Sequence, residues 1–117
     1  MHFFSSKFES YRTLTMVIEK KNMSNLKGIA IFPFAIVRDK SDKKLVNHEK
    51  IHLRQQLEML VIPFYIWYFT EWLIKGADNQ AYRNISFERE SFGNEENLSY
   101  LRTRKPYSWI KYLKPKK

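Results

Sequence analysis

The sequence predicts an α+β protein, in which a small N-terminal strand element packs on a helix and two further helices follow. Three observations support this fold class. Short apolar and β-branched segments come first, apolar residues take helical spacing from Leu45 onward, and 3 glycines and 4 prolines are too few for a turn-rich β-sandwich. With 117 residues we expect one domain over 1–117, with a variable segment at 1–24 and a basic tail at 101–117.

The expected strands lie within the first 37 residues. Thr13–Ile18 is a β-branched segment of strand length, and Gly28–Val37 is an apolar run too short for a lone helix. Because proline has no amide hydrogen, Pro33 predicts an edge or bulge position within the second strand. A charged turn follows, in which Ser41 or Asp42 is expected to cap the first helix.

The first expected helix begins near Leu45 and bends or stops at Pro63. After the apolar stretch that follows, turn-forming residues at 76–80 lead into a third helical segment, Ala81–Leu101, with Gly93-Asn94 as a point where it can break. Residues 109–113 predict a last aromatic turn that packs back on the domain.

The segment Met59–Thr70 holds no charged residue over 12 positions. Three interpretations stay open: a buried core helix, a helix in a membrane interface with the basic tail on anionic lipid, and a spanning helix, which needs about 20 apolar residues. Trp67 and Trp72 support the two membrane interpretations, because such rings favour the interface.

Charge is unevenly distributed along the chain. The net charge is +9, and residues 101–117 hold seven basic residues and no acid, whereas residues 86–97 carry a net charge of −3. This separation differs from the uniform basic face of a nucleic-acid module, so no nucleic-acid partner is expected. The absence of cysteine excludes a disulfide framework and thiolate zinc sites. Residues 1–8 are too short and polar for a signal-peptide core, which predicts a cytoplasmic protein, membrane-associated if the apolar segment meets lipid.

His48-Glu49-Lys50-Ile51-His52 is an HExxH pattern. On a helix, side chains four residues apart lie on the same face, so His48 and His52 can bind one metal ion from one side. Glu49 then lies beside that ion, where it can accept a proton from a water that the metal activates. The pattern therefore predicts a zinc (Zn²⁺) site with Glu49 as the catalytic base.

A catalytic zinc site needs a third protein ligand, with the fourth position left for water. Without cysteine, and with His2 as the only other histidine, that ligand is expected to be a carboxylate. The glutamates of residues 84–97 are the source, and Glu88, Glu90 and Glu95 remain open as the ligand. Glu88 and Glu90 are two residues apart on an expected helix, so both cannot face the ion.

These motifs resemble the gluzincin branch of zinc metallopeptidases, in which a glutamate from a second helix completes an HExxH site. The sequence ERESF at 88–92 is similar to the ExxA-D motif of that branch, and 94–95 is similar to its NE pair. The stretch NHEKIHLRQ at 47–55 also resembles short bacterial proteins of a minimal zincin type. The resemblance implies a zincin-like core, Glu88 as the third ligand, zinc as cofactor and a peptide or protein substrate.

Further expectations come from the same resemblance. Gly28–Val37 takes the place of the strand that pairs with substrate in gluzincins. Phe92 and Ser99 stand where the two motifs have acids that support a ligand histidine, so the sequence identifies no such acid. Candidates for a transition-state donor are Tyr82, Arg83 and Tyr100.

A competing hypothesis is a non-catalytic module that binds a membrane surface or another protein and carries a structural or vestigial zinc site. The basic tail and the aromatic residues of the apolar segment would then be its working parts. Metal content separates the two hypotheses, and neither specifies an oligomeric state.

Overall fold

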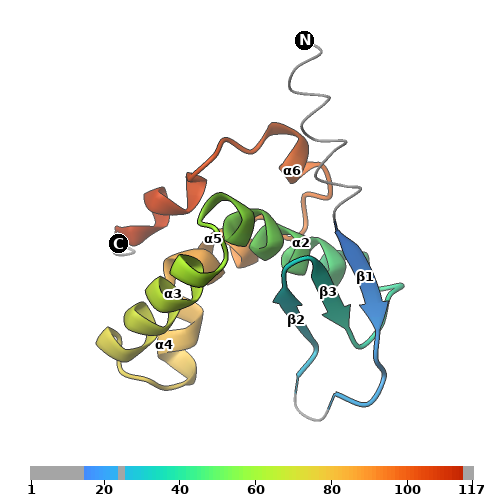
Figure 1. Cartoon of the computed structure of the whole chain (residues 1–117), viewed down its shortest axis with the longest axis horizontal. Helices are drawn as coiled ribbons and strands as arrows, with labels where there is room; N and C mark the ends of the chain where they lie inside the picture. The colour runs from blue at the N-terminus through green and yellow to red at the C-terminus, as the bar shows by residue number, and fades with distance from the viewer. Residues whose placement is uncertain (1–14, 24–25, 115–117) are drawn as a thin grey trace.

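The computed structural model describes residues 15–23 and 26–114. A three-stranded sheet forms the N-terminal part, with β1 at Met16–Glu19, β2 at Gly28–Ile31 and β3 at Phe34–Val37 (Figure 1). β2 and β3 pair antiparallel, β1 pairs parallel with β3, and the strand order β1-β3-β2 places β2 at one edge. The first strand thus lies at the end of the predicted segment and extends to Glu19, while residues 13 and 14 are outside the described part.

The single strand predicted over Gly28–Val37 is wrong. Pro33 and Phe32 form the turn that joins β2 to β3, so the apolar run is a hairpin of two four-residue strands. An apolar run of ten residues fits one long buried strand or two short ones equally well, and the fixed φ of proline favours the turn. The consequence for the site is that β2, and not the whole run, forms the free edge.

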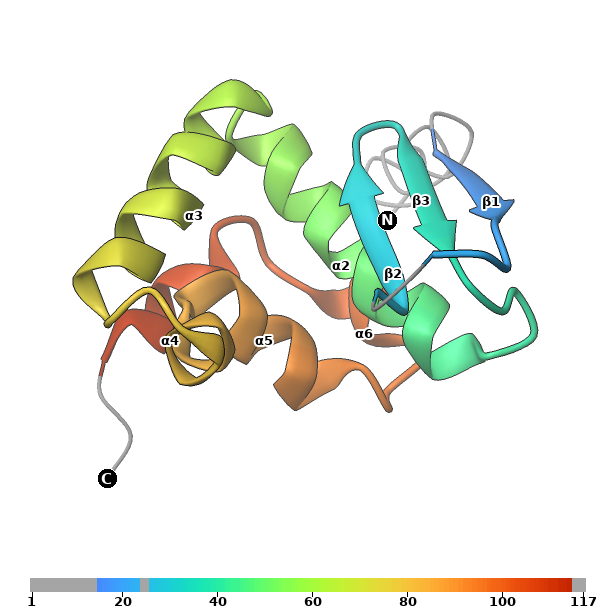
Figure 2. The ribbon, with the colours of Figure 1, turned by 90° about the horizontal axis from the view of Figure 1, so that it is seen from below.

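Helix α2 (Lys43–Glu58) carries the HExxH pattern and lies between the sheet and the C-terminal helices (Figure 2). Asp42 caps its N-terminus by accepting a hydrogen bond from the Leu45 amide over 3.1 Å, as one of the two predicted caps. Ile51 and Leu53 are fully buried and pack with Ala30 and Ala35 of the sheet. The helix is therefore fixed on the sheet by its apolar side.

Pro63 begins a helix instead of ending one. Leu60 and Val61 have positive φ angles of 61° and 65°, and they turn the chain through 114° between α2 and α3 (Ile62–Ile74). Pro63 lies in the first turn of α3, where its missing amide hydrogen costs nothing.

Most of α3 is not buried, so the interpretation as a core helix is wrong. Only Phe64 and Glu71 of its 13 residues are buried. Within the described ranges, no individual helix has the length and apolar character needed to cross a membrane, although α2 and α3 pass that test as a bent pair.

The helix predicted over Ala81–Leu101 is divided into three: α4 (Asn79–Asn84), α5 (Ser86–Asn94) and α6 (Tyr100–Thr103). Ile85 is extended, with φ −61° and ψ 136°, and it separates α4 from α5 because its side chain fills the core. The α+β class is confirmed, but the expectation of only two helices after α2 is wrong.

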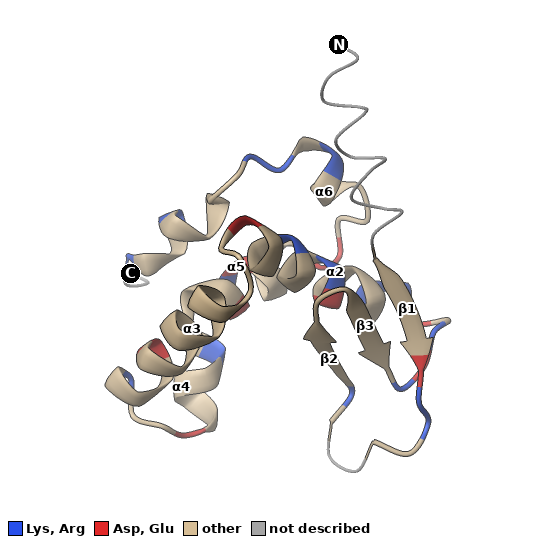
Figure 3. Ribbon diagram, in the orientation of Figure 1, with Lys and Arg blue, Asp and Glu red and all other residues tan. Residues whose placement is uncertain are grey.

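The aromatic turn predicted at 109–113 is confirmed as the 3₁₀ helix η1 (Ser108–Leu113). Trp109 is buried there and packs on Phe87 and Trp67, with ring centroids 4.6 Å and 5.4 Å apart. Although Lys and Arg are numerous in this part of the chain (Figure 3), the predicted basic tail is folded against α5 up to Lys114.

Candidate metal centre

Three candidate ligands meet between α2 and α5. His48 and His52 lie one turn apart on α2, and Glu88 extends from α5. Glu88 Oε1 is 3.1 Å from His48 Nε2 and 3.0 Å from His52 Nε2, and the two Nε2 atoms are 3.2 Å apart. All three residues are buried. Of the three glutamates weighed for this position, Glu88 is the one that faces the Nε2 atoms of both HExxH histidines.

The spacing of these atoms fits a tetrahedral metal ion. Ligand atoms about 2.0–2.1 Å from zinc, at tetrahedral angles, lie about 3.3 Å from one another. The observed separations of 3.0–3.2 Å are close to that value. Two imidazole nitrogens and one carboxylate oxygen are also a donor set that catalytic zinc sites use.

The orientation of His52 is fixed by Gln55. The Gln55 amide nitrogen donates to the Phe87 carbonyl over 3.1 Å and to Glu90 Oε1 over 2.9 Å. Its oxygen consequently faces His52 and accepts a hydrogen bond from Nδ1 over 2.7 Å. With the hydrogen of a neutral His52 on Nδ1, the lone pair of Nε2 points at Glu88.

Glu95 gives His48 the same support. Its Oε1 accepts from His48 Nδ1 over 2.7 Å, and its Oε2 lies 3.6 Å from Lys44 Nζ. Glu95 therefore lies on the far side of the imidazole from Glu88 and is not placed as a ligand. The acid that contacts His48 therefore comes from the turn after α5, and not from positions 92 or 99, where the sequence analysis found none.

The turn that carries Glu95 is held by Asn47, the residue before His48. Its amide nitrogen donates to the carbonyls of Asn94, Glu95 and Asn97 over 3.4, 2.9 and 3.0 Å. Ser91 adds a hydrogen bond of 2.7 Å to the His48 carbonyl. Asn47 and His48 thus tie α2 to α5 and to the turn that follows it.

Three acceptors converge at the centre of this network. When both neutral histidines carry their hydrogen on Nδ1, two Nε2 lone pairs and one carboxylate oxygen face one another at 3.0–3.2 Å. Buried acceptors in this arrangement repel unless a cation or a proton lies between them. The chemistry of the donor set therefore matches a bound cation.

The titration of the site has the same cause. Burial lowers the pKa of His52, but the Glu88 carboxylate and its hydrogen bond raise it, and the net pKa is about 9. Burial raises the pKa of Glu88, but His52 and His48 hold it below its usual range. A proton on His52 lies between these acceptors, and a cation that bound there would displace it.

Two tyrosines border the Glu88 carboxylate. Tyr68 of α3 donates to Glu88 Oε2 over 2.6 Å, and burial and the Glu88 charge raise its pKa, which keeps the hydroxyl protonated. Tyr82 of α4 lines the same cavity, and burial followed by the Glu88 charge raises its pKa as well. Of the predicted donors only Tyr82 is at the site: the Tyr100 hydroxyl donates to Glu90, and Arg83 lies 4.5 Å from the centre of the Phe92 ring.

Glu49 lies in a cavity of about 260 Å³ that the two histidines and Glu88 also line. Burial raises the pKa of Glu49, although the charges of His52 and His48 oppose this. Within residues 15–23 and 26–114 its carboxylate accepts no hydrogen bond, so it is free to bind water. Gly28 of β2 makes this space, since a Cβ there would be 2.9 Å from Glu49 Oε2.

Glu90 points away from the cavity. It accepts hydrogen bonds from Arg104, from the Tyr100 hydroxyl over 2.5 Å and from Gln55. Arg104 also forms two hydrogen bonds to Glu58 of α2, at 2.8 and 3.1 Å. These buried ion pairs fix the Glu90 carboxylate, which accepts from Gln55, and Gln55 in turn holds the orientation of the His52 ring.

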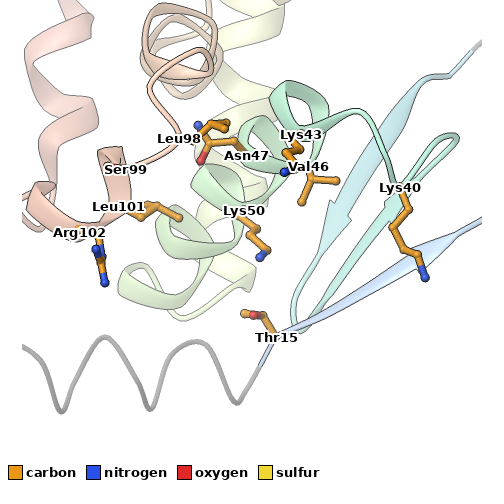
Figure 4. A pocket seen from close by; sticks show the side chains of 10 residues that line it. All are labelled: Thr15, Lys40, Lys43, Val46, Asn47, Lys50, Leu98, Ser99, Leu101 and Arg102. Carbon is orange, nitrogen blue, oxygen red and sulfur yellow. The ribbon is translucent and has the colours of Figure 1, made fainter.

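A larger cavity of about 390 Å³ lies on the other side of α2 and does not open on the histidines. Figure 4 shows the side chains around it. It is lined by Thr15, Lys40, Lys43, Val46, Asn47, Lys50, Leu98, Ser99, Leu101 and Arg102.

Comparisons with protein-family models, with curated proteins and with solved structures find no match to this chain. The geometry of the site therefore has to support any functional assignment without help from a relative.

Proposed function

We propose that this protein is a zinc-dependent metallopeptidase in which His48, His52 and Glu88 bind zinc and Glu49 is the general base. The observation that carries the proposal is that three buried acceptor atoms converge: Nε2 of His48, Nε2 of His52 and Oε1 of Glu88. The Nδ1 atom of each histidine is already hydrogen-bonded to another side chain. Zinc in such a site polarises a carbonyl and lowers the pKa of water. The Glu49 carboxylate, beside the ligands and without a hydrogen-bond donor of its own in the described ranges, accepts the proton of the attacking water.

The edge of β2 supports a peptide or protein substrate. The Arg38 amide donates to the Lys27 carbonyl, so residues 27 and 38 form a hydrogen-bonded pair at the end of the β2–β3 ladder. By the alternation of an antiparallel pair, the backbone groups of Gly28 and Ala30 point away from β3. The Ala30 carbonyl accepts from Gln56 and Tyr65, whereas Gly28 lies at the cavity beside Glu49. An extended substrate can pair with the Gly28 end of this edge by β-augmentation.

Zinc content is the direct test. We expect about one zinc per chain in protein purified without chelator, and a loss of bound zinc in His48→Ala, because the ligand set falls from three to two. His2→Ala removes the other histidine and is expected to keep its zinc. Elemental analysis of the three proteins decides the matter: trace zinc in all of them contradicts the metal site.

The roles of Glu88 and Glu95 are separable by metal affinity. Glu95→Ala removes the support of His48 and is expected to weaken zinc binding about 10–100-fold, as loss of such partners does. Glu88→Ala removes a ligand and is expected to weaken it more. Glu96→Ala, an exposed neighbour, serves as the control. Competition with a chromophoric chelator gives the affinities, and a larger effect for Glu95→Ala would mean that Glu95 is the ligand.

A further inference from the structure

The outward side of α3 is apolar. Ile62, Ile66, Phe69 and Leu73 are 70%, 64%, 47% and 57% exposed. Their spacing of four, three and four residues places them on one face of the helix, which we call the α3 stripe. A helix on the surface of a soluble domain normally turns polar residues to the water. The α3 stripe reverses that pattern along the whole length of the helix.

The apolar surface continues beyond the stripe. Leu60 and Ile74 are exposed at the two ends of α3, and Trp67 and Tyr65 are exposed on its two flanks. A contiguous exposed patch of this kind marks an interaction site. Tryptophan and tyrosine beside aliphatic residues are typical of the boundary between head groups and lipid tails.

The charges on α3 and on the neighbouring helix η1 favour an anionic partner. The one acid of α3, Glu71, is buried, and accepts from Ser86 and Lys75. On one flank, Trp67 contacts Trp109 of η1, and exposed Lys111 lies on that short helix with exposed Lys114 directly after it. An apolar surface with cations beside it and no exposed acid on its helix is complementary to an anionic bilayer.

We propose that the α3 stripe docks on the surface of an anionic lipid bilayer. At 13 residues α3 is shorter than a span requires, and it lies in the plane of the interface with its stripe among the head groups and upper tails. This proposal concerns a surface that holds none of the metal ligands and therefore stands or falls independently of the zinc site.

The position of the stripe also relates the membrane to the metal cavity. An almost wholly apolar pocket of about 450 Å³ lies between α3 and α4 and includes Phe69 of the stripe. Tyr65, Tyr68 and Tyr82 line both this pocket and the metal cavity. The apolar pocket beside the stripe and the cavity at the candidate metal site therefore share three of their lining side chains.

Sedimentation with vesicles tests the docking. The wild-type protein is expected to bind vesicles of phosphatidylcholine with phosphatidylglycerol, to bind phosphatidylcholine alone more weakly, and to be released in part by salt. Ile66→Ser/Phe69→Ser removes two apolar side chains and is expected to lower the partition coefficient about 100-fold. Met16→Ser/Leu98→Ser, at positions 56% and 57% exposed elsewhere, is the matched control and is expected to bind as the wild type does.

Circular dichroism and urea unfolding, measured on the same samples, show that each variant is folded. Lys111→Gln/Lys114→Gln is expected to weaken binding only to the anionic vesicles, and it tests the charge contribution without changing the stripe. The proposal is overturned if the wild type stays in solution with anionic vesicles, or if the stripe variant binds as well as the control. A dimer in light scattering that the stripe variant dissociates would assign the surface to a second copy.

Discussion

Glu49→Gln is expected to bind zinc as the wild type does and to hydrolyse peptide bonds about 10²–10⁴-fold more slowly. The amide keeps the size of the side chain in the cavity beside Gly28 but cannot accept a proton from water. Because Glu49 is not among the converging ligand atoms, metal binding should not change. The rate of cleavage of a panel of unstructured peptides, with zinc measured in each sample, checks this result.

Glu96→Gln is the control for this experiment, since it makes the same chemical change on an exposed glutamate. Equal cleavage by Glu49→Gln and the wild type would show that Glu49 is not the base. Zinc bound in both proteins without cleavage by either would contradict the peptidase and favour a structural metal site in a binding module.

Arg104→Met is expected to lower the free energy of unfolding by about 3–5 kcal/mol at neutral pH. The substitution keeps most of the buried volume but leaves the carboxylates of Glu90 and Glu58 without their cation. Glu90 is fully buried, so its charge has no access to water. Urea unfolding measures the change, and Lys105→Met, at an exposed neighbouring position, is expected to stay within about 0.5 kcal/mol of the wild type.

The loss in Arg104→Met should depend on pH in a defined direction. In the wild type, burial raises the pKa of Glu90 but Arg104 lowers it further, so the ionised carboxylate stabilises the fold above the usual carboxyl range. Without Arg104, burial raises that pKa and only the hydrogen bonds from Tyr100 and Gln55 oppose it, so the cost of the unpaired charge is present at neutral pH and disappears as the carboxyl is protonated. The difference between the two proteins should therefore shrink toward about pH 4. A constant difference would show that lost packing, and not the unpaired charge, is the cause.

The local part of the site could be predicted from the sequence. The spacing of His48 and His52 places two imidazoles on one face of any α-helix. That part of the site therefore depends only on residues 43–58 being helical, as they are in α2. The choice of Glu88 over Glu90 and Glu95 needed the motif resemblance, because all three are within eight residues. The rotation of α5 separates Glu88 from Glu90, and the end of that helix separates both from Glu95. The α+β class followed from the same kind of local pattern.

The long-range part could not be predicted. Glu95 meets His48 across 47 positions, and its place in a turn after α5 follows from the way Asn47 holds that turn. Tyr68 lies in a mostly apolar segment, and nothing in its local sequence indicates that its hydroxyl donates to Glu88. The contact between Gln55 and His52 is different, because it is local. Gln55 follows His52 by three residues on the same face of α2, and this helical spacing could have indicated it from the sequence.

The polar chain behind His52 begins and ends on one helix. It runs from Gln55 of α2 to Glu90, then to Arg104, and returns to α2 at Glu58. Anything that binds only the folded chain adds to its stability by mass action, so zinc affinity and folding would be thermodynamically linked. A substitution in this hydrogen-bonded series of side chains would lower the apparent zinc affinity without changing a proposed ligand, because a smaller fraction of the protein is folded. Affinities of such variants describe the geometry of the metal site only after their populations of folded protein are taken into account.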